Sequence, residues 1–354
     1  MMTETLSLPV LPKQPAGVAW PTKEWTRGEV PAGTDKSTLK ALLDHAFAEH
    51  APVDLEETHA LVIVQGGKLI KERYWTGFGP DVTCPSWSKA KSITQALVGI
   101  LVGDGKINIH APADVPEWYE TPDDPRAKIT LDQLLRMSSG LAFREDYVDG
   151  EASDVIEMLF GKGKDDIGHF AASLPLAHAA GEFWSYSSGT TNIIVRAMQK
   201  ALGLKGAAFE AFMRERLFDV IGMTSAAPKF DKAGTFVGSS FCYATPRDFA
   251  KFGLLYLRDG IWEGKRLLPE GWVDYARTPT WQQPEAIAEN TPYGAQWWLG
   301  LGGPGSFSAN GYEGQFTCCI PDLDMVIVRH GKTNAAQGPE VKAWIRAVAD
   351  CFRG

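Results

Sequence analysis

The spacing of hydrophobic residues changes along the chain, and each spacing predicts a kind of element. Residues 61–64 form a continuous apolar run, followed by a Gly-Gly turn and a second stretch at 68–75, which is typical of a β-hairpin in a buried sheet. Sheet patterns return near the other end of the chain, at 295–299, 315–320 and 325–329. Apolar residues at helical spacing predict helices over 37–50, 87–101, 131–137, 152–160, 191–202, 207–218, 248–257 and 339–352.

This order of elements predicts a sheet that is built from both ends of the chain and interrupted by a helical block. The expected fold class is therefore α/β (α+β), with a mixed antiparallel sheet domain flanked by helices and an inserted helical domain. We assign residues 1–105 and 245–354 to the α/β sheet domain and residues 106–244 to the helical domain. A chain of 354 residues with 44% apolar content is long enough for about two domains.

Charge and cysteine content exclude several kinds of function. The formal charge is −8 and no long run of Lys or Arg is present, which argues against nucleic acid as a partner. No apolar stretch approaches the roughly 20 residues that a membrane helix needs, and the first residues do not read as a secretory signal, so a cytoplasmic location is expected.

Five cysteines without C-x-x-C spacing indicate reduced thiols, and the adjacent Cys318 and Cys319 are expected to face opposite sides of a strand. No metal or other cofactor is predicted; the expected partner is a small ester or amide substrate, bound by a monomer or homodimer.

The segment 85–94 contains the most informative candidate chemistry. A serine in the first turn of a helix, with a lysine three residues later, places a hydroxyl and an amine on one helical face. A desolvated lysine can take the serine proton, which makes the serine a nucleophile. Two such registers overlap here, Ser86/Lys89 and Ser88/Lys91. Because Ser86 follows Pro85 and is expected to cap the helix, we favour Ser88/Lys91 and keep Ser86/Lys89 as the alternative.

Two further segments bring groups that such a site can use. Tyr186 stands in an aromatic and hydroxyl-rich loop, 181–189, before a predicted helix, where its phenol can reach into a cleft. The Gly-rich stretch 309–315 precedes a predicted strand, and such a backbone can approach a ligand and present N–H groups to it. A packed tyrosine and an ordinary hairpin corner are the alternatives when each segment is taken alone.

In combination, these segments resemble serine β-lactamase-like hydrolases of the class C and penicillin-binding-protein type. The closest resemblance is to carboxylesterases with a β-lactamase fold and to aminohexanoate-oligomer (nylon-oligomer) hydrolases. It covers nearly the whole chain and is carried by SKAKSIT at 88–94, LLRMSSGL at 134–141, YSSG at 186–189, YATPRD at 243–248, FGLLYL at 252–257 and GYEGQ at 311–315. The resemblance implies a β-lactamase/transpeptidase-like fold and a cofactor-free hydrolase that forms an acyl-serine.

The resemblance also implies a role for individual residues. Ser88 would be the acylated nucleophile, Lys91 its activating amine, and Tyr186 the phenol that relays protons to the leaving group. The backbone N–H groups of Ser88 and Tyr312 would form the oxyanion hole. The substrate-binding candidates are Asn310, Gly311, Trp184, Ser188, Trp298 and Asp146. Asp146 belongs to an acidic loop, 144–151, that borders the cleft in relatives; it either attracts an amine-bearing substrate or is a solvated loop.

Two departures from the family pattern move the site away from penicillins. Ala309 replaces the lysine of K-T-G, and Ser188 replaces the amide of Y-x-N. The aromatic residues Trp184, Trp297, Trp298 and Tyr312 favour an apolar acyl or alcohol group, unless they belong to the core. The predicted function is hydrolysis of small-molecule esters, with an amidase for short amino-acid oligomers as the alternative. A non-catalytic ligand-binding module or a weak β-lactamase is the second alternative.

Overall fold

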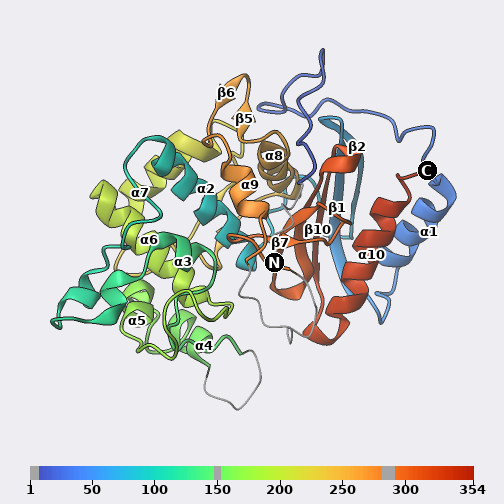
Figure 1. Ribbon diagram of the computed structural model, residues 1–354. Helices are drawn as coiled ribbons and strands as arrows, with labels where there is room; N and C mark the ends of the chain where they lie inside the picture. The colour runs from blue at the N-terminus through green and yellow to red at the C-terminus, as the bar shows by residue number, and fades with distance from the viewer. Residues whose placement is uncertain (1–7, 147–152, 281–291) are drawn as a thin grey trace, which may run out of the picture.

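The computed structural model describes residues 8–146, 153–280 and 292–354. Its main sheet is antiparallel and has six strands in the order β2-β1-β10-β9-β8-β7 (Figure 1). The strands are β1 Glu57–Gln65, β2 Lys68–Tyr74, β7 Trp298–Leu299, β8 Phe307–Gly311, β9 Gln315–Ile320 and β10 Met325–Lys332. Both ends of the chain contribute strands to this sheet, as the sequence predicted, and the two ends pair directly, since Val62 of β1 faces Val328 of β10.

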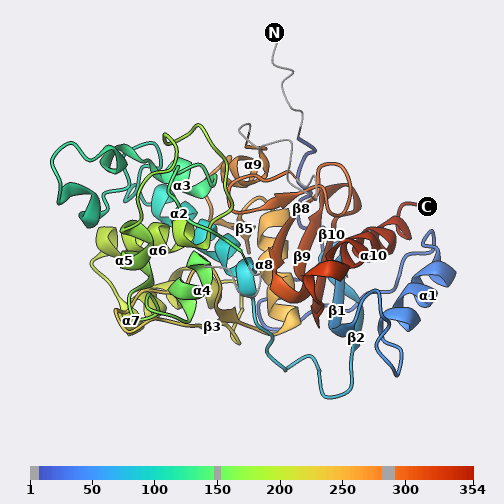
Figure 2. The ribbon, with the colours of Figure 1, turned by 90° about the horizontal axis from the view of Figure 1, so that it is seen from below.

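Helices cover both faces of this sheet. On one face lie α1 (Lys36–Ala46) and α10 (Gly338–Asp350), and on the other lies α8 (Pro246–Leu257) (Figures 1 and 2). Side chains alternate between the two hydrophobic clusters, since successive residues of a strand point to opposite faces. Cys318 packs in the cluster with α10 and Cys319 in the cluster with α8, which confirms the prediction for this pair.

Most of the remaining helices lie together at the opposite end of the molecule from α1 and α10 (Figure 1). They are α2 Ala90–Gly103, α3 Leu131–Leu135, α4 Asp154–Leu159, α5 Ile167–Ala172, α6 Ser188–Leu202 and α7 Gly206–Met213. Every residue of α2 from Ala90 to Leu101 is buried, so this helix forms the centre of the molecule. The fold class agrees with the prediction, whereas the division of the chain into two domains stays a prediction.

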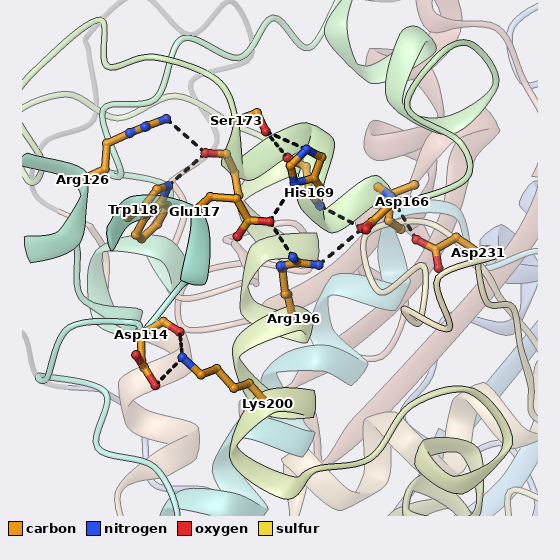
Figure 3. A network of polar contacts seen from close by, with 12 residues as sticks. Asp114, Glu117, Trp118, Arg126, Asp166, His169, Ser173, Arg196, Lys200 and Asp231 are labelled. Atoms are coloured by element: carbon orange, nitrogen blue, oxygen red, sulfur yellow. Dashed lines mark hydrogen bonds and ion pairs between the residues drawn. The ribbon is translucent and has the colours of Figure 1, made fainter. Parts of the chain in front are cut away.

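An ion-pair network links α6 to α5 and to the segment that contains Glu117 (Figure 3). The Glu117 carboxylate lies 2.5 Å from Arg196 of α6 and 2.8 Å from His169 of α5. Arg196 also lies 3.4 Å from Asp166, the N-cap residue of α5. Burial raises the pKa of Glu117, but the hydrogen bond from His169 and the charge of Arg196 outweigh it and hold that pKa below its usual range. The network therefore fixes α5 against α6, whose first turn carries candidate site residues.

Several predicted elements are shorter than the sequence pattern suggested. The helix predicted over 207–218 is α7 followed by a π-helical turn at Arg214–Phe218. The strand predicted at 295–299 is reduced to β7, because Gln296 has a left-handed backbone (φ 61°) that a regular strand cannot contain. The other short strands and the last short α-helix to be named are β3 Ala227–Pro228, β4 Cys242–Tyr243, β5 Ile261–Trp262, β6 Lys265–Arg266 and α9 Trp272–Arg277. None of the helices described is both long and apolar enough to cross a membrane.

Candidate active site

The centre of the candidate site is the 3₁₀ turn Trp87–Lys89 that leads into α2, where the side chains of Ser88 and Lys91 meet. Lys91 Nζ lies 3.1 Å from Ser88 Oγ, 2.9 Å from Ser188 Oγ and 3.0 Å from the carbonyl oxygen of Ser239. Only 1% of Lys91 is exposed. Burial lowers the pKa of Lys91 to about 8, although the negative charge of Glu145 opposes this shift. The amine is therefore held against the serine hydroxyl with a pKa at which it can lose its proton near neutral pH.

The alternative register, Ser86 with Lys89, does not form a pair. Ser86 Oγ donates to the carbonyl oxygen of Ser240 at 3.0 Å and accepts from the N–H of Cys242 at 2.9 Å. Lys89 Nζ lies 3.1 Å from His330 Nε2. Ser86 occupies the N-cap position, but its hydroxyl makes no capping bond because both of these partners lie on the neighbouring 240–242 segment. Ser86 is therefore at the predicted cap position but makes no side-chain capping bond, and the geometry favours Ser88 and Lys91.

Tyr186 approaches the same serine from the loop before α6. The loop is fixed because Ser187 caps α6, accepting the N–H of Thr190 at 3.1 Å. The Tyr186 side chain interacts with the side chain of Ser88, a contact that by itself lowers the pKa of the phenol, and Lys91 Nζ lies 4.8 Å from the centre of the tyrosine ring. Burial raises the pKa of Tyr186, and the charge of Glu145 raises it further, so the phenol stays protonated. The structure thus brings together the three residues that the sequence analysis singled out.

Glu145 is a residue of this site that the sequence analysis missed. Its carboxylate accepts the backbone N–H of Ser188 at 2.7 Å and the Ser188 hydroxyl at 2.6 Å. The acidic loop was noted, but Asp146 was chosen within it, and Asp146 is exposed. Residues 147–151 of the same loop lie outside the described residues. The sequence signal was a run of adjacent acids, which does not say which of them meets α6.

The Gly-rich segment forms the opposite wall of the site. A Cβ atom at Gly311, the last residue of β8, would lie 2.3 Å from the carbonyl oxygen of Ser86, so only glycine permits this close approach. Tyr312 follows, with 40% of its surface exposed and its ring edge-on to Trp87 at 5.5 Å. Asn310 pairs with β9, and its Oδ1 is buried without a hydrogen-bond partner among the described residues.

Aromatic rings extend the site beside Tyr186. The Trp298 ring lies 5.3 Å from Tyr186 and 4.9 Å from Tyr293, and Trp184 packs edge-on against Trp298 at 6.4 Å. Trp184 is only 5% exposed and supports this cluster. Trp297 is fully buried in the main core, because it points away from its neighbour Trp298. The core alternative therefore holds for Trp297.

A cavity of about 300 Å³ adjoins the other side of the Tyr186 loop. It is lined by Met137, Ser139, Gly140, Leu141, Ala142, Phe143, Arg144, Ala177, His178, Phe183, Ser185 and Ser187. Its walls are mainly apolar. Ser185 and Ser187, on either side of Tyr186, and Arg144, next to Glu145, contribute to them. Among the residues that the structure describes, no three His, Cys, Asp or Glu side chains gather as metal ligands would.

Comparison with known proteins gives a consistent result. The family model described as Beta-lactamase matches residues 56–350. The chain is 28% identical over 321 residues to the 6-aminohexanoate-dimer hydrolase of Paenarthrobacter ureafaciens, covering 84% of this chain and 79% of that protein. Solved structures that share the fold include the following two. "Putative 6-aminohexanoate-dimer hydrolase from Bacillus anthracis" has a TM-score of 0.73 at 22% identity, covering 96% of this chain and 89% of that one. A family VIII carboxylesterase has a TM-score of 0.68 at 14% identity, covering 92% and 99%.

Proposed function

Because the chain belongs to the beta-lactamase family, we propose that it is a serine hydrolase that cleaves small-molecule esters through an acyl-serine intermediate. The observation that carries the proposal is the contact of 3.1 Å between Ser88 Oγ and the buried amine of Lys91. The pKa of about 8 for Lys91 supports it, because a base is most effective when its pKa lies near the working pH. We also propose that the protein is cytoplasmic and acts as a monomer or homodimer, as the sequence predicted.

The proposed reaction proceeds in two halves. Neutral Lys91 takes the proton of Ser88 as the serine oxygen attacks the ester carbonyl. The backbone N–H groups of Ser88 and Tyr312 bind the oxyanion, and Tyr186 gives a proton to the departing alcohol while Lys91 returns its proton to the phenol. Water then attacks the acyl-serine by the same route, which releases the acid and restores Ser88.

The charges around the site favour neutral substrates over penicillins. Ala309, where penicillin-recognising relatives have a lysine, is 2% exposed and supplies no cation. The Glu145 carboxylate lies at the first turn of α6 and repels a substrate carboxylate. Trp298 and Tyr312 offer apolar surface instead. These features support an uncharged acyl group and argue against the weak β-lactamase alternative.

An amidase for short amino-acid oligomers is the second candidate. Glu145 favours it, since its carboxylate, which accepts from Ser188 next to Lys91, attracts a substrate ammonium group. The similarity to a protein named 6-aminohexanoate-dimer hydrolase favours it as well. In this case Tyr186 would protonate a departing amine, which is a poorer leaving group than an alcohol.

The test is hydrolysis of an ester and an anilide that share one short acyl group. We expect Ser88→Ala to lower kcat/KM at least about a hundredfold, whereas Ser86→Ala keeps kcat/KM within about threefold. A fluorophosphonate should add covalently to the wild type and to Ser86→Ala, but not to Ser88→Ala, as intact mass will show. The ratio of ester to anilide rates decides between the two candidates. Full activity of Ser88→Ala would overturn the proposal.

A further inference from the structure

Trp87, the residue before the nucleophile, is tied to the wall of the site that follows β8. Its indole Nε1 donates to Glu313 Oε2 at 3.2 Å, and its ring meets the ring of Tyr312. Both Trp87 (φ 44°) and Glu313 (φ 60°) have left-handed backbones. Bulky residues rarely adopt this conformation, and it persists only where the surroundings hold it.

Lys89, the residue after the nucleophile, is tied to the same wall by a buried chain of side chains. His330 Nδ1 lies 2.9 Å from Gln315 Oε1, which can only accept, so Nδ1 carries the proton and donates. His330 Nε2 is then the acceptor for Lys89 Nζ at 3.1 Å. Gln315 Nε2 donates in turn to the carbonyl oxygen of Glu313 at 3.1 Å. Both neighbours of Ser88 therefore connect to Glu313.

The turn at Glu313 is itself held from the sheet. Arg329 of β10 is fully buried, and its Nη1 donates to the carbonyl oxygen of Gly314 at 2.8 Å. The N–H of Thr333 donates to the carbonyl oxygen of Glu313 at 3.2 Å. These bonds fix the main chain of the turn, so the Glu313 carboxylate reaches the nucleophile segment from a fixed backbone.

We propose that Glu313 is a positioning residue, whose carboxylate holds Trp87 so that the main-chain N–H groups of Ser88 and Tyr312 stay at the spacing of one oxyanion. The inference rests on the proposed function, because it assumes that these two groups form the oxyanion hole. The two groups belong to segments more than 200 residues apart in the sequence, so their spacing depends on contacts across the gap. A hydrogen bond to a charged acceptor is a strong contact of this kind. Small misplacements at a reacting centre reduce rates by large factors.

The test compares variants that remove the Trp87–Glu313 bond with one that keeps an acceptor. Glu313→Ala removes the acceptor, Trp87→Phe removes the donor, and Glu313→Gln retains an amide oxygen at the same place. We expect Glu313→Ala and Trp87→Phe each to lower kcat/KM between about tenfold and a hundredfold, and Glu313→Gln to stay within about threefold. The double variant should have about the same kcat/KM as the less active of the two single variants, because both substitutions break the same hydrogen bond and their effects do not add.

Inhibition by an arylboronic acid separates positioning from general loosening of the structure. The boronate forms a tetrahedral adduct with Ser88, and one of its oxygens occupies the oxyanion hole. Its affinity should fall by the same factor as kcat/KM in Glu313→Ala, and the melting temperature should stay within about 2 °C. Glu263→Ala is the matched control, since Glu263 also has a left-handed backbone (φ 49°) and accepts a side-chain bond, from Thr22, in the β5–β6 hairpin.

Three results would overturn the inference. Wild-type kcat/KM in Glu313→Ala is the first. A loss of kcat/KM in Glu313→Ala without a parallel loss of boronate affinity is the second. The third is a loss of kcat/KM in Glu263→Ala as large as the loss in Glu313→Ala. If Ser88→Ala is inactive while Glu313→Ala is unaffected, the inference alone fails. If Ser88→Ala stays active, the proposed function fails and the inference fails with it.

Discussion

Replacing Glu145 with glutamine removes the negative charge that lies two hydrogen bonds away from Lys91. Ser188 Oγ connects the two groups, at 2.6 Å from Glu145 and 2.9 Å from Lys91. Burial lowers the pKa of Lys91 to about 8, and the charge of Glu145 opposes that shift by favouring the ammonium form. Without this charge the pKa of Lys91 falls. The amine that accepts the serine proton then becomes available at lower pH.

The magnitude for the wild type follows from the value of about 8. At pH 7 about one Lys91 amine in eleven is neutral, and at pH 9 about ten in eleven are, so kcat/KM is expected to rise about tenfold between these pH values. In Glu145→Gln the midpoint of the profile moves to lower pH, and the ratio of the rates at pH 9 and pH 7 becomes smaller. The midpoint of the pH profile is the quantity that tests the argument. The maximal kcat/KM at high pH can fall for another reason, because the Glu145 carboxylate also orients Ser188.

The assay is the pH dependence of kcat/KM for a neutral ester whose leaving group does not titrate, from about pH 5.5 to 10, corrected for spontaneous hydrolysis. Asp146→Asn is the control, because Asp146 is an exposed neighbour of the same charge whose carboxylate accepts no bond from Ser188. An unchanged or raised midpoint in Glu145→Gln would refute the reasoning. An equal shift in Asp146→Asn would also do so, since it would show that any nearby charge has this effect.

Two further variants test contacts around the site. Ser86→Ala should destabilise the protein by about 1–3 kcal/mol in urea unfolding, because the buried N–H of Cys242 loses its acceptor and the carbonyl oxygen of Ser240 its donor; unchanged stability would contradict this. Glu117→Gln should lower stability at pH 7 by a similar amount, since the carboxylate charge that pairs with Arg196 and accepts from His169 is removed. The pKa of Glu117 is lowered by folding, so its contribution is present above the unfolded-state pKa and is lost as pH falls through the folded-state pKa. The difference between variant and wild type should therefore narrow in acid, and a deficit that is equal at pH 7 and pH 3 would contradict the linkage.

The features that were predictable from the sequence depend on spacing within one element. Ser88 and Lys91 are three residues apart in the first helical turns, and the structure places their side chains 3.1 Å apart. Cys318 and Cys319 face opposite sides of their strand because side chains alternate along every strand. The continuous apolar runs of β1 and β10 indicated strands with both faces buried, because alternating side chains place apolar residues on each face. Local periodicity therefore located the sheet and the candidate nucleophile.

The features that were missed depend on contacts between segments far apart in the sequence. Glu145 meets Ser188, which follows it by 43 residues, at the first turn of α6, and nothing in a run of acidic residues indicates which one makes this contact. Ser86 looked like a helix cap, but the 240–242 segment occupies its hydroxyl. The left-handed backbone of Trp87 has no sequence signal, since it is a tryptophan in a position that usually favours glycine.

The pairing of β1 with β10 also has a consequence for synthesis on the ribosome. Val62 leaves the ribosome long before its partner Val328, and at elongation rates of about 5–20 residues per second the delay is roughly a quarter of a minute to a minute. During that time one edge of the apolar strand β1 has no native partner, and such an edge can pair with other chains. Aggregation of the nascent chain is thus a hazard that ends only when the last strand emerges. A greater supply of chaperones during translation should accordingly raise the yield of this protein.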